Sequence, residues 1–290
     1  MFVWGTTFVL VKDALQDASP LLFNLLRMAM AFVALAIVNH RQLRHINRRA
    51  IFSGVIVGLF LASGYQFQTA GLARTTPAKS AFITGLVVVF VPLFTIVPAL
   101  RSANTPAPRR TTAIGALLAF SGLLLLTTPA GTSLKNLFVS IGPGDLLTLG
   151  CAIAFAGHLL TLAHTSRQVP TGQLATIQIG AAALIMAITL PIGGRPHLSI
   201  TPRLLIALAV TSLLATAAAF TIQSWAQQHL PPTHTAILLT LEPVFACLTS
   251  FLVLHEHLGR RSLAGAALIL AGIVVTELLS TPTPLPIHPE

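Results

Sequence analysis

The chain has 290 residues, of which 54% are hydrophobic and only 8% are charged, and its formal net charge is +10. A soluble domain carries about 25% charged residues, so a soluble fold of this length could not cover its surface. Composition therefore excludes an ordinary soluble domain and indicates an integral membrane protein, whose apolar side chains face lipid. The arginines lie in short loops between apolar runs, where they are topology signals, and no basic helix surface predicts a nucleic-acid partner.

Ten apolar runs follow one another, separated by polar or helix-breaking residues. Runs of about 20 residues predict helices, because a helix satisfies its own backbone groups in hydrocarbon, whereas barrel strands would alternate strictly. The predicted fold is an all-α integral membrane protein of about ten transmembrane helices. The predicted helices cover residues 1–16, 20–38, 51–71, 77–100, 111–128, 144–164, 171–191, 203–227, 233–254 and 261–279.

The two ends of the chain are unusual. The first apolar run, 1–11, is long enough to span only if the helix continues through Lys12 and Asp13, or if the true start lies upstream. Residues 281–290 carry four prolines. Such a tail is predicted to be disordered and cytoplasmic.

The chain repeats itself. Residues 76–83 resemble 231–238, and at the same offset of 155 residues Gln68 falls on Gln223. The repeat predicts two related five-helix halves, 1–141 and 142–280. Because five is odd, the second half enters the membrane from the opposite face, which is the inverted-repeat plan of many transporters.

Small residues are dense in the last predicted helix of each half. Gly115 and Gly122 match Gly265 and Gly272 at an offset of 150 residues. Small side chains permit close helix approach. We expect these positions to form a packing face or the face of a homodimer, without substrate contact.

Basic loops follow the second and fourth helices of each half, so the positive-inside rule pulls the two halves in opposite directions. Four arginines between residues 41 and 49 make the bias stronger in the first half, which is also synthesised first. We therefore predict that both termini are cytoplasmic and that the protein lies in a bacterial-type inner membrane.

Two ionisable residues lie within predicted helices, where such groups are costly and often functional. Glu242, followed by Pro243, is interpreted either as facing a central cavity, where it binds a cationic group or a proton, or as a buried structural acid. Arg27 is expected to bond carbonyl groups at a helix end. The alternative for Arg27 is an anion-binding site for a substrate carboxylate.

Aromatic and amide side chains gather near the predicted helix ends. Trp4, Tyr65, Gln68 and Gln223 are candidates for a pocket that stacks a ring and binds a polar group. The alternative is an interfacial aromatic belt. His158 is a further candidate pocket residue, although it and the deep Gln178 favour a helix–helix hydrogen bond.

No cofactor or metal is predicted. His255, Glu256 and His257 are consecutive and do not share one helix face, unlike zinc-binding histidines at i and i+4. The sequence contains no nucleotide-binding loop and no catalytic motif. Any pumping must therefore use a gradient.

Several segments together resemble one family. Residues 4–9, WGTTFV, resemble the first-helix W-G-x-x-F motif of EamA-type transporters of the drug/metabolite transporter superfamily. Residues 241–246, 254–256 and 265–272 resemble the end of that family's second repeat, and 82–93 the matching part of the first. The resemblance implies ten helices in two inverted repeats. It also implies a central cavity built from the first, third and fourth helices of each half, and transport often driven by protons.

The predicted function is secondary transport of a small metabolite by alternating access. The aromatic and amide mixture suits an amino acid, a related amphipathic solute or a drug, exported on a gradient. A passive channel is the alternative. A membrane-embedded transferase is the weaker rival, since it would need clustered acids or histidines at membrane depth, and we predict no enzyme activity.

Overall fold

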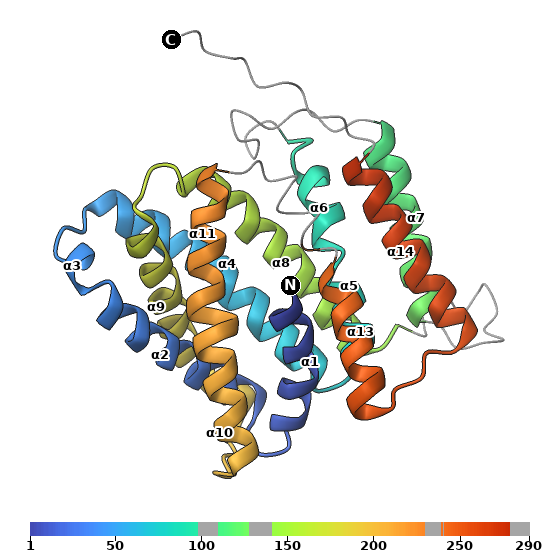
Figure 1. Cartoon of the computed structure of the whole chain (residues 1–290), viewed down its shortest axis with the longest axis horizontal. Coiled ribbons are helices and arrows are strands. Elements are labelled where there is room, and N and C mark those ends of the chain that lie inside the picture. Colours follow the sequence, from blue (N-terminus) through green and yellow to red (C-terminus); the bar gives the residue numbers. More distant parts are fainter. Residues whose placement is uncertain (98–109, 128–140, 230–238, 240, 279–290) are drawn as a thin grey trace, which may run out of the picture.

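The computed structural model describes residues 1–97, 110–127, 141–229, 239 and 241–278 (Figure 1). In these residues every regular element is a helix, and each of the ten predicted intervals contains helix. The first half consists of α1 Phe2–Ala14, α2 Pro20–Val38, α3 His40–Leu43, α4 Arg48–Leu72, α5 Pro77–Thr84, α6 Val87–Phe94 and α7 Arg110–Thr127. The second half consists of α8 Pro143–Thr165, α9 Thr171–Thr189, η3 Leu190–Gly193, α10 Pro202–Ala209, η4 Val210–Ala218, α11 Ala219–His229, α13 Leu241–Leu254 and α14 Arg260–Leu278.

Six of the described helical stretches are long and apolar enough to cross a membrane. They are Pro20–Val38, Arg48–Leu72, Pro77–Phe94, Pro143–Thr165, Thr171–Gly193 and Pro202–His229. Shorter apolar helices occupy Ala113–Leu123 and Leu241–Leu254. Large apolar side chains are exposed on the outer faces, among them Val38 at 75%, Phe52 at 68% and Ile188 at 70%. Exposure on this scale fits contact with lipid.

The predicted helix 77–100 is not continuous. It is divided into α5 and α6, which are separated by Gly85 and Leu86. Glycine is a poor helix former. A Cβ atom at Gly85 would lie 3.3 Å from Cγ of Pro243, so glycine also permits the close approach of α13. Residues 98–100, the proline-rich tail and the start of the predicted helix 233–254 lie outside the described residues.

The long stretch Pro202–His229 contains a π-helix, η4, between α10 and α11. Its hydrogen bonds join residues five apart, and π-turns within α-helices often occur at functional sites. The apolar run at 203–227 predicts one regular helix here. The π-helix is therefore a difference between prediction and structure, and it lies beside the cavity described below.

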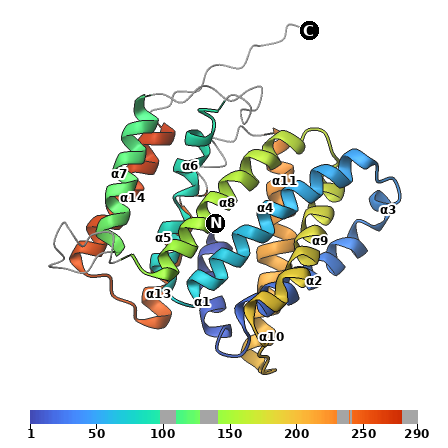
Figure 2. The same cartoon turned by 180° about the vertical axis from the view of Figure 1, so that it is seen from behind.

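Helices from the two halves pack against each other along the whole molecule. α7 and α14 lie side by side in both views (Figures 1 and 2). A Cβ atom at Gly122 would lie 2.5 Å from the carbonyl oxygen of Gly265, and one at Gly272 would lie 2.5 Å from that of Gly115. These small residues form a packing face within one chain. The largest buried apolar cluster continues from this face into α5, α6 and α8.

At one end of the bundle, α1 is tied to α4 through Lys12. The Lys12 Nζ donates to the carbonyl oxygens of Leu72 at 2.7 Å, Thr75 at 2.9 Å and Ala73 at 3.2 Å. The last carbonyls of a helix have no partner within the helix, and a lysine can supply one. This contact explains a lysine within the first predicted helix.

Polar contacts at the same end join the first half to the second. The Arg203 side chain donates to both oxygens of Asp17, each at 2.8 Å, and the Lys79 Nζ lies 2.8 Å from Asp145. Beside Asp17, Ala18 forms an isolated antiparallel bridge with Leu198. The loop position of Arg203 predicts only a topology signal, but the structure gives this arginine an acidic partner.

Candidate functional site

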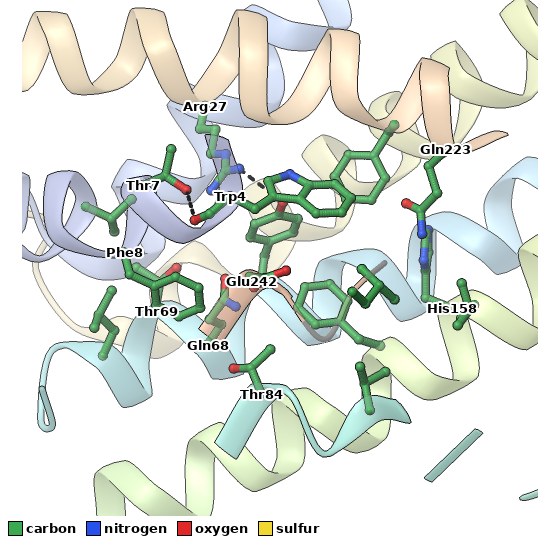
Figure 3. A pocket seen from close by; sticks show the side chains of 18 residues that line it. Trp4, Thr7, Phe8, Arg27, Gln68, Thr69, Thr84, His158, Gln223 and Glu242 are labelled. Atoms are coloured by element: carbon green, nitrogen blue, oxygen red, sulfur yellow. Dashed lines mark hydrogen bonds between the residues drawn. The ribbon is translucent and has the colours of Figure 1, made fainter. Parts of the chain in front are cut away.

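A cavity lies between the two halves, with side chains contributed by α1, α2, α4, α5, α6, α8, α11 and α13 (Figure 3). Its empty volume, counted with the part open to solvent, is about 730 Å³. All six predicted pocket residues line this cavity, and Arg27 lines it as well. The lining consists of Trp4, Thr7, Phe8, Val11, Arg27, Tyr65, Gln68, Thr69, Leu72, Thr84, Val87, Phe155, His158, Leu159, Phe220, Gln223, Leu239 and Glu242.

Arg27 enters the cavity wall from α2 and is only 3% exposed. Its Nε donates to the hydroxyl of Thr216 at 2.7 Å, and its Nη2 donates to the hydroxyl of Tyr65 at 3.0 Å and to the carbonyl of Ala215 at 3.4 Å. All these acceptors are neutral. Among the described residues, Nη1 has no hydrogen-bond partner and the guanidinium has no acidic partner within 4 Å.

Trp4 is near the start of α1, and its ring lines the cavity. Its indole Nε1 donates to the carbonyl oxygen of Ala215 at 2.8 Å, so the ring is anchored to η4. Gly5 brings α1 close to α13, since a Cβ atom there would lie 2.6 Å from Cβ of Phe245. The W-G pair thus combines a fixed aromatic ring with a close helix contact.

Aromatic rings form a continuous wall around the middle of the cavity. Tyr65 meets Phe155 edge-to-face with ring centroids 5.3 Å apart, and meets Phe220 at 6.0 Å. Phe220 also contacts Trp4 at 5.6 Å and His158 at 5.5 Å. Such geometry is favourable for aromatic pairs and offers ring faces and edges to an apolar group.

His158 forms the helix–helix hydrogen bond that the sequence favoured. Its Nε2 lies 2.9 Å from Oε1 of Gln178, whose Nε2 donates to the hydroxyl of Ser224 at 3.1 Å. This chain of bonds links α8, α9 and α11 within the second half. His158 therefore both lines the cavity and holds three helices together.

Glu242 lies in the first turn of α13 as the structure describes it, and its carboxyl group points into the cavity (Figure 3). It has no hydrogen-bond or ion-pair partner among the described residues. Helix N-termini favour negative charge, which suits a carboxylate in this position. The cavity thus contains one acid and one arginine that do not neutralise each other directly.

Gln68 and Gln223, which are 155 residues apart, face the cavity from α4 and α11. The Oε1 of Gln223 is buried and has no hydrogen-bond partner within the described part of the chain. A buried amide oxygen without a partner costs free energy unless a ligand or water supplies a donor. Gln223 is thus available to a polar group in the cavity.

Phe155 and Phe220 also line the cavity but are not predicted by the sequence, because phenylalanine in an apolar run has no distinguishing feature. One signal could have found Phe220. The offset of 155 residues that pairs Gln68 with Gln223 also pairs Tyr65 with Phe220. The described residues contain no cluster of three or more side chains able to hold a metal ion.

The sequence of the chain is similar to those of known transporters. Residues 1–128 and 142–278 each match the EamA-like transporter family. An "Uncharacterized transporter" of Archaeoglobus fulgidus is 30% identical, over 95% of this chain and 82% of that protein. The uncharacterized transporter YoaV of Bacillus subtilis is 25% identical, over 93% and 91%.

Two further matches come from a plant and from a solved structure. A WAT1-related chloroplastic protein of Arabidopsis thaliana is 28% identical, over 95% of this chain and 67% of that protein. A crystal structure superposes with a TM-score of 0.66 over 96% of each chain, at 19% identity. At this identity the crystal structure shows only that the fold is shared.

Proposed function

Because the chain belongs to the EamA-like transporter family and is a multi-pass membrane transporter, we propose that it exports a small zwitterionic metabolite by alternating access. The proposed membrane is the inner membrane, with both termini cytoplasmic and a gradient as the driving force. The observation that carries the proposal is a cavity between the halves in which neither Arg27 nor Glu242 has a partner of opposite charge among the described residues.

The proposed architecture is two inverted five-helix repeats, 1–141 and 142–280. Helix contacts support it, because several pairs have a counterpart when the halves are exchanged: α4 packs on α8 as α10 and η4 pack on α1. Gly122 against Gly265 likewise has its counterpart in Gly272 against Gly115. Loop positions also fit. The loop that contains Leu198 lies at the start of α2, where Leu198 pairs with Ala18, whereas residues 39–47 follow the other end of α2. The two loops therefore lie at opposite ends of this helix, as inverted repeats require.

The charges of the cavity favour a solute that carries both signs. A buried cation is stabilised by an anionic partner, and the arginine fork suits a carboxylate. The free carboxyl of Glu242 suits an ammonium group. The rings of Trp4, Tyr65 and Phe220, which line the same cavity, suit an apolar side chain. An amino acid has these three parts.

Glu242 is also the proposed site of proton coupling. A carboxyl group without a fixed partner can exchange a proton and a substrate ammonium group in turn. Binding of one would then release the other, which links substrate movement to a proton gradient.

The test is uptake and efflux in proteoliposomes with an imposed pH gradient. Three probes of similar size separate the charges: L-phenylalanine, which is a zwitterion, L-phenylalaninamide, which is a cation, and 3-phenylpropionate, which is an anion. The wild-type protein is expected to carry the zwitterion best, with a rate that saturates. A rate that rises linearly with concentration would instead indicate a channel.

The matched variants are Glu242→Gln, inside the cavity, and Glu256→Gln, outside it. Glu242→Gln is expected to remove the response to the pH gradient, whereas Glu256→Gln is expected to keep it. If Glu242→Gln transports like the wild type at every pH, Glu242 has no coupling role. If the three probes move equally well, zwitterion recognition is wrong.

A further inference from the structure

The third helix of each proposed repeat begins in the same way. The Asn47 side chain caps α4 by accepting from the backbone N–H of Ala50, and the Thr201 side chain caps α10 by accepting from that of Leu204. These two caps are 154 residues apart. Further along the same helices, Gln68 and Gln223 are 155 residues apart. The helical stretch Pro202–His229 therefore contains one residue more between its cap and its glutamine than α4 does.

The extra residue is accommodated by the π-helix η4. A turn closed between residues five apart holds one residue more than an α-turn. α4 is α-helical over all 25 of its residues, whereas Pro202–His229 changes to π at Val210–Ala218. Both glutamines face the cavity in spite of the different residue count. The π-helix thus keeps the two helices in phase.

A side-chain contact marks the same turn. The hydroxyl of Thr216 donates to the carbonyl of Thr211, five residues back, at 2.7 Å. Thr211 and Thr221, outside the centre of η4, donate to carbonyls four residues back. Because the Thr216 proton is used in this way, its oxygen lone pairs face Arg27 and accept from Nε.

Both anchored groups of the cavity attach to this turn. Trp4 and Arg27 donate to the carbonyl of Ala215, and Arg27 donates to Thr216 as well. At the offsets of 154 and 155 residues, Thr216 corresponds to Ala62 and Leu61 of α4, which carry no hydroxyl. The first half cannot offer the same acceptors.

We propose that the single-residue insertion in η4 is a positioning device. It presents Ala215 and Thr216 as acceptors that aim Arg27 and Trp4 into the cavity, and so makes a cavity between two similar halves asymmetric. The anionic end of the substrate is thereby bound on the Arg27 side. This last step rests on the proposed function, whereas the anchoring does not.

The first test is deletion of Leu213, a half-exposed residue of η4. The deletion restores the residue count of α4 and is expected to convert η4 to α-helix while Gln223 stays in phase. The readout is the indole N–H signal of Trp4 by nuclear magnetic resonance in nanodiscs, assigned with Trp225→Phe. The signal is expected to move upfield and to exchange faster with solvent. The control, Leu213→Ala, retains the chain length and is expected to leave the signal in place.

A second variant, Thr216→Val, preserves chain length and guards against a deletion that fails to fold. It is expected to shift the Nε–H signal of Arg27, assigned with Arg27→Lys, and to leave the Trp4 signal unchanged. In proteoliposomes it is expected to raise KM for L-phenylalanine about tenfold with little change in kcat, because one hydrogen bond to a charged group is lost.

The outcomes separate the two proposals. An unchanged Trp4 signal in a folded deletion variant overturns the positioning device, and so does an unchanged Arg27 signal in Thr216→Val. If the wild-type protein carries none of the three probes, the proposed function fails while the two signals still decide the anchoring.

Discussion

Tyr65 and Phe220 meet edge-to-face in the wall of the cavity, with ring centroids 6.0 Å apart and an interplanar angle of 72°. They occupy positions 155 residues apart, the offset that also pairs Gln68 with Gln223. The same place in two similar helices thus supplies both rings. Only Tyr65 carries a hydroxyl, and that hydroxyl accepts from Arg27.

The Tyr65 hydroxyl is expected to matter for binding more than for folding. Tyr65→Phe retains both ring contacts but removes one acceptor of the Arg27 guanidinium. We expect KM for a zwitterionic substrate to rise about tenfold, as for loss of a hydrogen bond to a charged group. Transport kinetics in proteoliposomes measure this change. An unchanged KM would mean that the hydroxyl does not hold Arg27 for substrate.

Arg27 is expected to distinguish substrates by their carboxylate. Arg27→Gln removes the positive charge and leaves a hydrogen-bonding side chain. The variant should lose at least about tenfold in apparent affinity for L-phenylalanine and change little toward L-phenylalaninamide, which has no carboxylate. Competition assays with the two probes report the ratio, and size-exclusion chromatography checks the fold. Equal losses for both probes would assign Arg27 a purely structural role.

Alanine substitutions at the two ends of the contact between α7 and α14 are expected to destabilise the fold equally. In Gly122→Ala and in Gly272→Ala the new Cβ would lie 2.5 Å from a backbone oxygen, so the helices must move apart. Overpacking of this kind costs about 1–3 kcal/mol. Thermal unfolding in detergent should show similar losses for both variants. Gly259→Ala is the control, since nothing lies within 4 Å of its Cβ position. A large loss in only one variant would contradict the symmetric crossing.

Asp17 is expected to stabilise the fold in a pH-dependent way. It lies between α1 and α2, and hydrogen bonds from Arg203 and Thr201 lower its pKa from 3.8 to about 2. A lowered pKa means that the stabilisation is fully present above about pH 4 and is lost as the pH falls toward 2. Asp17→Asn should therefore unfold at a lower temperature than the wild type at about pH 7, and the difference should vanish near pH 2. A constant difference would rule out ionised Asp17 as the cause.

Because its pKa is low, Asp17 is not expected to cause any pH dependence of transport near neutral pH. Asp17 stays ionised throughout the physiological range, so it cannot titrate during a cycle near neutral pH. Any change in transport rate between about pH 5 and pH 8 is then expected to persist in Asp17→Asn. Rates measured across this range in both proteins test the expectation.

Helix positions were readable from the sequence wherever an apolar run met a clear boundary. The predicted helix 20–38 coincides with α2, because proline strongly favours the first turn of a helix and Pro20 marks that start. The division of 77–100 at Gly85 was not readable, because its cause includes the approach of Pro243 from a distant segment. The π-helix was not predictable for a related reason: the residues that bond to its acceptors, Trp4 and Arg27, lie on distant helices.

The candidate site was readable to the extent that polarity is rare in apolar helices. Trp4, Gln68, Gln223 and Glu242 stood out for this reason, and the cavity contains them all. Phe155 and Phe220 were invisible, since their role depends only on which way they face. The partners of Arg27 were expected to be carbonyls at a helix end, but two of the three are hydroxyl groups. Only the three-dimensional arrangement identifies such partners.

The contacts at one end of the bundle have a mechanical consequence. The pairs of Asp17 with Arg203 and of Lys79 with Asp145 each bridge the halves, and both lie at the end where Lys12 holds α4. We expect that solute enters the cavity from that side only after these bridges part, so that they act as a latch. Since dissolved ions weaken attraction between partly exposed charges, the latch should open more readily in concentrated salt.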